Sequence, residues 1–162
     1  VKSGFRAKEI ASLQWKMLVN SDGQMMNEIH LTNTASKGKS SGRVISIHKD
    51  LKKALVELYE QISYKKSFQL ETAYVITTER SNHTSAQAIV NTFQRWYSDL
   101  GFIGASSHSG RRTFITNVAK KISAVGGSMR DVQSLAGHSN LSTTQRYIEV
   151  DTMSQRKVID LI

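Results

Sequence analysis

The sequence contains neither cysteine nor proline. Without cysteine, the chain can form no disulfide bond and no thiolate metal site. No segment approaches the roughly 20 apolar residues that a membrane-spanning helix needs, and the first residues lack the apolar region of a signal peptide. These absences exclude a disulfide-stabilised secreted protein. We expect a cytoplasmic protein that does not associate with a membrane.

Acidic residues are also few, with 13 Asp and Glu against 22 Lys and Arg, so the net charge is +9 over 162 residues. A basic domain of this size attracts polyanions, DNA or RNA first. The alternative is a basic protein with no role on nucleic acid. Hydrophobic residues make up 39% of the chain and charged residues 22%, values typical of a globular domain. The length predicts one compact domain with a real core.

Hydrophobic periodicity predicts an α+β domain, mainly helical, in which a small N-terminal sheet accompanies a bundle of helices. Ala7, Ile10, Ala11 and Leu13 recur at helical spacing. We expect three antiparallel strands at 17–19, 29–31 and 44–47, with a hairpin turn at 20–23. Further helices are expected at 51–58, 85–100 (capped by Thr84 or Ser85), 108–122, 128–135, 142–148 and 153–161.

Four segments combine basic, histidine and tyrosine residues: 4–9 (GFRAKE), 36–39 (SKGK), 108–112 (HSGRR) and 135–138 (LAGH) followed by 144–147 (TQRY). Cleavage of a phosphodiester needs fixed cations to hold the charged oxygens, together with a nucleophile and a proton donor. The four segments supply these groups. No cluster of carboxylates indicates a metal site, so the sequence gives little support to a metal-dependent nuclease.

Local spacing supports this interpretation. His108 and Arg111 are three residues apart at the expected start of a helix, so they share one face near a terminus that favours anions. Arg6 and Glu9 are also three apart, and Glu9 could orient the arginine. Lys37 lies in an expected turn between two strands, which suits a mobile proton donor.

These motifs together resemble a known family. The patterns Gly-Phe-Arg-x-x-Glu-Ile-x-x-Leu, Lys-Gly-Lys between strands, His-x-x-Arg-Arg-Thr, Leu-x-Gly-His and a tyrosine nine residues after that histidine resemble the tyrosine recombinases of the phage integrase family. Each motif alone is weak, but five in the family's order over nearly the whole chain are specific. The resemblance implies the tyrosine recombinase catalytic fold and site-specific DNA recombination.

The resemblance implies a reaction that needs no metal and no other cofactor. Tyr147 would attack phosphorus, forming a 3′-phosphotyrosyl bond and freeing a 5′-hydroxyl, and the reverse step with a new 5′-hydroxyl would rejoin the strand. Arg6 and Arg111 would clamp the phosphate. We therefore expect an integrase or recombinase, with a non-catalytic DNA-binding module of the same fold or a type IB topoisomerase-like enzyme as alternatives.

The resemblance also assigns the remaining catalytic residues. Lys37 would protonate the 5′-oxygen, His108 would act in proton transfer, and His138 would hydrogen-bond the scissile phosphate, with Glu9 in support. Two features depart from the family pattern. Lys39 is only two residues from Lys37, and we prefer Lys37 as the proton donor. Gly110 stands where the family usually has leucine. The residues expected to bind DNA outside the catalytic set are Lys39, Arg43, Arg112 and Arg146.

The expected partner is double-stranded DNA, on which members of the family act as tetramers. The tail at 151–162 is expected to form a short amphipathic helix that packs either on a neighbouring protomer or on its own chain. We expect residues 1–162 to be a single catalytic domain of a longer recombinase, without the N-terminal core-binding domain that family members carry.

Overall fold

The computed structural model describes residues 2–35, 42–148 and 152–160. The chain divides into two compact units, Val1–Phe114 and Ile115–Ile162, which we call the N-terminal and the C-terminal unit. The boundary lies inside one helix, α4 (Ser107–Lys121).

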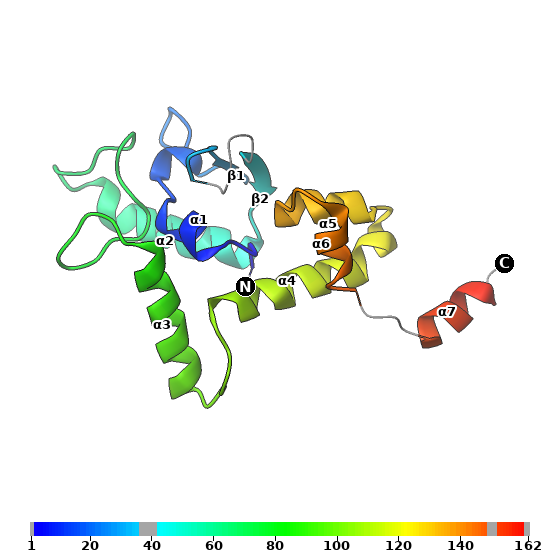
Figure 1. The fold of residues 1–162 in the computed structure, drawn as a ribbon. Coiled ribbons are helices and arrows are strands. Elements are labelled where there is room, and N and C mark those ends of the chain that lie inside the picture. The colour runs from blue at the N-terminus through cyan, green and yellow to red at the C-terminus, as the bar shows by residue number, and fades with distance from the viewer. Residues whose placement is uncertain (1, 36–41, 149–151, 161–162) are drawn as a thin grey trace. The chain divides into compact units, whose positions relative to one another are not determined.

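Helices dominate both units (Figure 1). Before α4, the N-terminal unit contains α1 (Ala7–Ala11), the 3-10 helix η1 (Trp15–Met17), β1 (Glu28–Leu31), β2 (Arg43–Ser46), α2 (Lys49–Ser63) and α3 (Ala86–Asp99). After α4, the C-terminal unit contains the 3-10 helix η2 (Ile122–Val125), α5 (Met129–Ala136), α6 (Leu141–Gln145) and α7 (Thr152–Ile159). The prediction of a mainly helical chain with a small antiparallel sheet is confirmed.

The prediction of a third strand is not confirmed. In the described part of the chain the sheet has two strands, with Ile29 opposite Ile45 and Leu31 opposite Arg43. The strand expected at 17–19 is replaced by η1 and a single bridge from Val19 to Met25. Trp15, Met17, Leu18 and Val19 are all at most 3% exposed. A strand at a surface would expose every second residue. The segment is instead buried almost continuously, and it forms a tight helical turn.

The helix α1 packs against α3 in the N-terminal unit. Ala7 and Ala11 lie against Ile89, and Phe93 covers the cluster. The small alanine side chains let the two helices approach closely. The Ser85 hydroxyl accepts a hydrogen bond from the backbone N–H of Ala88, so the cap predicted for α3 is present. This packing fixes the beginning of α1, where the first predicted functional residues lie.

The helix α5 packs against α6 in the C-terminal unit. It begins at a capping box formed by Ser128 and Asp131 and ends at Gly137, whose backbone is left-handed with φ 60°. Val132 and Ala136 are buried on its inner face. The predicted cap and terminator of this helix therefore both have their expected roles. Across the residues described in both units, no helix is both long and apolar enough to span a membrane.

Candidate active site

Arg6 and Glu9 form the beginning of α1. Arg6 is the N-cap residue, and its backbone N–H donates to Glu9 Oε2 at 2.7 Å. Its guanidinium Nη1 also donates to Glu9 Oε1 at 3.0 Å. The Glu9 side chain is 1% exposed and that of Arg6 is 26% exposed. Glu9 therefore holds Arg6 by backbone and side chain while part of the guanidinium stays accessible.

A second arginine binds the same carboxylate. Arg43, the first residue of β2, donates from Nη1 to Glu9 Oε1 at 2.7 Å and from Nη2 to Glu9 Oε2 at 3.2 Å. Its side chain is only 8% exposed. Arg43 was predicted to bind DNA; that role remains a prediction, and in this structure its two terminal nitrogens are engaged by Glu9.

The electrostatics of this cluster follow from its charges. Burial acts to raise the pKa of Glu9, but the hydrogen bonds from Arg43 and from the Arg6 backbone, with both positive charges, hold the pKa below its ordinary value. Glu9 is therefore ionised at neutral pH. Two guanidinium groups and one carboxylate leave a net positive charge next to the accessible face of Arg6.

Arg111 is tied to the segment that precedes α1. It lies on α4, is 7% exposed, and donates from Nη1 to the backbone carbonyl of Gly4. Gly4 has φ +61°, and a Cβ at this position would collide with the ring of Phe114. Only glycine fits here without strain. Gly4 is two residues before Arg6, so both predicted clamp arginines are held by one short segment.

His108 lies one turn before Arg111 on α4 and is exposed. Its Nδ1 lies 3.5 Å from the Ser107 hydroxyl, and its backbone N–H donates to the Ser106 hydroxyl. The spacing predicted for His108 and Arg111 on one helix is present. The exposed imidazole of His108 has room to exchange protons.

His138 is fixed in the C-terminal unit by its neighbours in sequence. Its backbone N–H donates to the carbonyl of Gln133, and the side-chain amide of Gln133 donates back to the carbonyl of His138 at 3.0 Å. Its Nδ1 lies 3.0 Å from the hydroxyl of Thr144, which is fully buried. When Thr144 donates to Nδ1, a neutral imidazole carries its proton on Nε2, which can then donate to a phosphate oxygen.

Tyr147 follows α6 and is half-buried. Its ring stacks on the His138 ring with centroids 5.6 Å apart and an interplanar angle of 22°. Its backbone carbonyl accepts a hydrogen bond from the Thr116 hydroxyl at 3.5 Å. The C-terminal unit thus brings together the predicted nucleophile and the histidine predicted to bind the phosphate.

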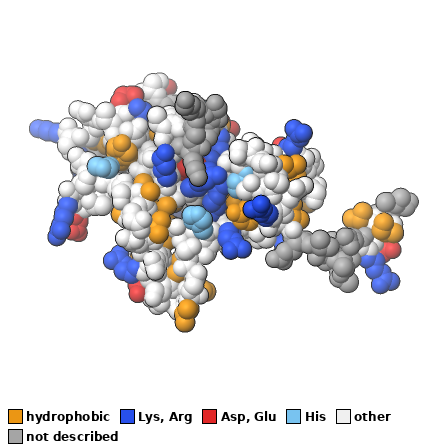
Figure 2. All heavy atoms as spheres, in the orientation of Figure 1, with side chains coloured by type: hydrophobic (Ala, Val, Ile, Leu, Met, Phe, Trp, Pro, Cys, Tyr) orange, Lys and Arg blue, Asp and Glu red, His pale blue; other side chains and the backbone are white. Residues whose placement is uncertain are grey.

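Some predicted site residues are not placed by these contacts. Lys37 and Lys39 lie outside the described residues. Arg112 and Arg146 are exposed, which suits contacts with a DNA backbone. Figure 2 shows lysine and arginine side chains spread over the visible surface of each unit. No group of three or more His, Asp or Glu that could hold a metal occurs among the residues that the structure describes.

Sequence reasoning missed the roles of three groups, namely the Gly4 carbonyl, the Thr144 hydroxyl and the bond between Arg43 and Glu9. For the Gly4 carbonyl, the only signal in the sequence was a glycine two residues before a functional arginine. Thr144 is one of many polar residues on a helix, and its burial is not visible in the sequence. The partner of Arg43 is 34 residues away, so no local pattern indicates it.

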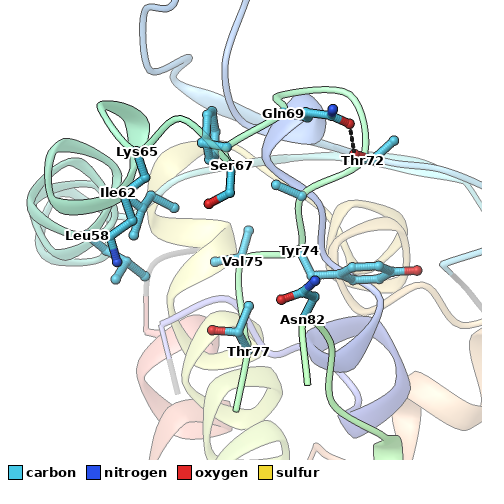
Figure 3. Close-up of a pocket in the computed structure, with 12 residues that line it drawn as sticks. Leu58, Ile62, Lys65, Ser67, Gln69, Thr72, Tyr74, Val75, Thr77 and Asn82 are labelled. Carbon is cyan, nitrogen blue, oxygen red and sulfur yellow. Dashed lines mark hydrogen bonds between the residues drawn. The ribbon is translucent and has the colours of Figure 1, made fainter. Parts of the chain in front are cut away.

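A pocket of about 590 Å³ lies elsewhere in the N-terminal unit. Figure 3 shows Leu58 and Ile62 of α2 on one side and Tyr74 and Val75 on the other. None of the predicted site residues lines it. This pocket is therefore separate from the predicted site residues.

Comparisons with known proteins identify a family and a fold. Residues 1–153 match the model of the phage integrase family. The chain is 30% identical to tyrosine recombinase XerC of Actinobacillus pleuropneumoniae over 109 residues, which are 67% of this chain and 34% of that protein. It is 26% identical to tyrosine recombinase XerC of Thermodesulfovibrio yellowstonii over 161 residues, 98% of this chain and 50% of that protein. The chain thus spans half or less of these curated relatives.

Two solved structures share the fold. The Tn1549 transposon integrase, in a complex with a circular intermediate DNA, has a TM-score of 0.73 at 18% identity, and the match covers 99% of this chain and 55% of the integrase. The XerA recombinase has a TM-score of 0.71 at 20% identity, with 99% of this chain and 54% of that one covered. At these identities the likeness shows the fold alone.

Proposed function

Because the chain belongs to the phage integrase family, we propose that it is the catalytic domain of a tyrosine recombinase, a site-specific enzyme that cleaves and rejoins DNA strands. Its substrate is double-stranded DNA. The Tyr147 oxygen attacks the scissile phosphorus, and the bond from phosphorus to the 5′-oxygen breaks. The products of this step are a 3′-phosphotyrosyl protein and a 5′-hydroxyl.

One observation carries this proposal. Arg111 binds the carbonyl of Gly4, 107 positions away in sequence, and Gly4 is two residues before Arg6. This bond holds Arg111 next to the segment that carries Arg6. Such an arrangement is expected if both arginines bind the same phosphate, because the transition state adds negative charge to the phosphate oxygens. Guanidinium groups bond two oxygens at once and do not deprotonate, which suits them to this task.

The remaining groups supply proton transfer and orientation. His138 donates from Nε2 to a phosphate oxygen, in the tautomer that Thr144 favours. His108 takes part in proton transfer, and Lys37 protonates the leaving 5′-oxygen. In the complex with DNA the groups of both units act on one phosphate, and the exposed Arg112 and Arg146 bind neighbouring phosphates together with Lys39.

Assembly on DNA is part of the proposal. The enzyme acts as a homotetramer, with α7 as the element that joins protomers. Val158 and Ile159 of α7 are 56% and 69% exposed, and apolar side chains so exposed on one short helix are stabilised by packing on another surface. Packing of α7 on its own chain is the alternative. The protein is cytoplasmic and of bacterial, phage or mobile-element origin, a proposal that the relatives described above support.

Trapping of the covalent intermediate tests the proposal. The protein is incubated, with EDTA present, with a pool of nicked duplexes of random sequence in which the cleaved fragment diffuses away. We expect an adduct that survives denaturation and whose released DNA end accepts phosphate from polynucleotide kinase, as a 5′-hydroxyl does. Tyr147→Phe should form no adduct and should still bind DNA.

Tyr64→Phe is the matched control, because Tyr64 is 77% exposed and lies on no predicted site element. It should form as much adduct as the wild type. An adduct from Tyr147→Phe would refute the nucleophile assignment. DNA binding by the wild type without any adduct would favour a non-catalytic module, and relaxation of supercoiled plasmid without strand exchange would favour a topoisomerase.

A further inference from the structure

Arg43 and Arg6 both bind Glu9, but they differ in how they bind it and in how exposed their side chains are. Its two terminal nitrogens bond both oxygens of Glu9 at 2.7 and 3.2 Å, and 8% of the side chain is exposed. Arg6, which shares Glu9 Oε1, is 26% exposed. Among the described residues, Arg43 Nε is buried and has no hydrogen-bond partner. Of these two arginines, Arg6 is the more exposed, and a phosphate can approach it without breaking the bidentate pair between Arg43 and Glu9.

The bond between Arg43 and Glu9 joins two elements that the sequence separates. Glu9 lies in the first turn of α1, and Arg43 begins β2, where it pairs with Leu31 of β1. The two residues are 34 positions apart. A planar bidentate pair restricts both distance and orientation, so the pair sets the rotation of Glu9 relative to the sheet. Glu9 in turn holds the backbone and the guanidinium of Arg6.

We propose that Arg43 is a positioning residue for DNA cleavage: acting through Glu9, it holds Arg6 in the orientation that binds the scissile phosphate, and it does not contact DNA itself. This inference rests on the proposed function. It assigns a different task to Arg43 from the DNA contact that its basic surroundings in the sequence indicate.

Charge compensation explains why one arginine would be insufficient. A buried carboxylate with only the partly exposed Arg6 as a partner would have to give up part of its charge or draw the Arg6 guanidinium inward. With Arg43 bound, Glu9 is neutralised from the buried side. The exposed part of the Arg6 side chain then keeps its positive charge, and a phosphate would approach it there.

The test compares four proteins: the wild type, Arg43→Gln, Arg6→Ala and the double variant. The rate of adduct formation is measured in single turnovers at saturating DNA, on a duplex that the wild type cleaves. We expect Arg43→Gln to lower the rate about 100-fold, as small misplacements of a catalytic group do. The double variant should be no slower than Arg6→Ala alone, because Arg43 acts through Arg6. Multiplied effects in the double variant would overturn the proposal.

DNA binding gives a second and independent readout. Each phosphate contact contributes about one to the slope of log K against log salt concentration. In the Arg6→Ala background, Arg43→Gln should leave the slope unchanged, whereas Arg112→Gln, a matched change at an exposed arginine, should lower it by about one. A slope that Arg43→Gln lowers further in the Arg6→Ala background, as Arg112→Gln does, would mean that Arg43 contacts phosphate itself and would overturn the proposal.

Arg43→Lys keeps the charge and guards against loss of folding in Arg43→Gln. A lysine cannot bond both carboxylate oxygens in a plane, so this variant should cleave at a rate between those of Arg43→Gln and the wild type. Full wild-type rates in both Arg43 variants would reject the positioning role. If the wild type itself forms no adduct on any duplex, the proposed function fails instead, and the two failures are thereby separated.

Discussion

The N-terminal unit holds Arg6 with a buried carboxylate, whereas the hydrogen bonds described for His138 and Tyr147 in the C-terminal unit are with uncharged groups. Glu9, bound by two arginines, is fully buried in the first, and Arg111 is 7% exposed. In the second, the contacts described for His138 include a threonine hydroxyl, an amide and a tyrosine ring. No salt bridge is found among the described residues of the C-terminal unit.

This difference corresponds to the tasks proposed for the Arg6 guanidinium, which stabilises charge, and for the Tyr147 hydroxyl, which loses its proton. Groups that stabilise charge must stay fixed and ionised, and a buried ion pair with several hydrogen bonds achieves this at the expense of desolvation. Groups that give or receive protons must change state during the reaction, and neutral contacts leave them able to do so. We therefore expect pH and mutation to act differently on the two units.

The largest effect is expected at Arg111. Arg111→Ala removes a fixed cation from the proposed phosphate site, and loss of one such donor lowers a cleavage rate by about 10³-fold, near 4 kcal/mol in the activation free energy. Single-turnover adduct formation measures it. Arg112→Ala changes the exposed neighbour on the same helix and should lower the rate far less. If both variants lost the same fraction of the cleavage rate, Arg111 would act only through its positive charge near DNA and not as a fixed ligand of the phosphate.

A smaller effect, on stability, is expected at Glu9. Glu9→Gln breaks the charged pairs with Arg6 and Arg43 and should lower the free energy of unfolding by about 3 kcal/mol at neutral pH. The pKa of Glu9 in the folded chain is lowered, so its contribution to stability is complete above its ordinary pKa of 4.5 and is lost as the pH falls through the lower folded value. The difference between wild type and variant should therefore shrink below pH 4.5.

Urea unfolding at a series of pH values measures this difference. The pKa values of Asp50 and Asp131 are also lowered, by hydrogen bonds from Lys2 and Ser128, but both aspartates are present in wild type and variant and cancel in the comparison. Glu57→Gln, at an exposed position of α2, should leave stability nearly unchanged. A Glu9 effect as large at pH 3 as at pH 7 would show that its charge is not what stabilises the unit.

The smallest effect is expected at Thr144, in the C-terminal unit. Thr144→Val keeps the shape of the side chain but removes the partner of His138 Nδ1, which should cost about 1 kcal/mol of stability. Cleavage should fall about tenfold, because the imidazole no longer prefers the tautomer with its proton on Nε2. The ¹⁵N chemical shifts of His138 report the tautomer. Thr143→Val is the control, and a Thr144 effect larger than that of Glu9→Gln would reverse the comparison.

Much of the fold could be predicted because its signals are local. Ser85 and Ser128 begin helices as their spacing indicates, and Gly137 ends one. The prediction of a strand at 17–19 was wrong because a run of apolar residues also fits a buried tight turn. Packing with distant segments decides which of the two forms. Residue pattern alone does not distinguish these two outcomes.

The predicted site residues could be chosen from sequence, but their partners could not. Arg6 and Glu9 are three apart, and their bond follows from helix geometry. The partners of Arg43 and Arg111 are 34 and 107 positions away, and one of them is a backbone carbonyl. A carbonyl is present at every residue, so the sequence does not indicate which one an arginine binds.

The bond between Arg111 and the Gly4 carbonyl also has a consequence for how the protein is made. A contact across 107 positions closes a long loop, which costs more entropy than the six-residue separation of His138 and Thr144. During synthesis Gly4 leaves the ribosome long before Arg111 exists. We therefore expect the arginine pair to assemble after the local helices have formed. A nascent chain would then be unable to hold both arginines in place until the segment from Gly4 to Arg111 has folded.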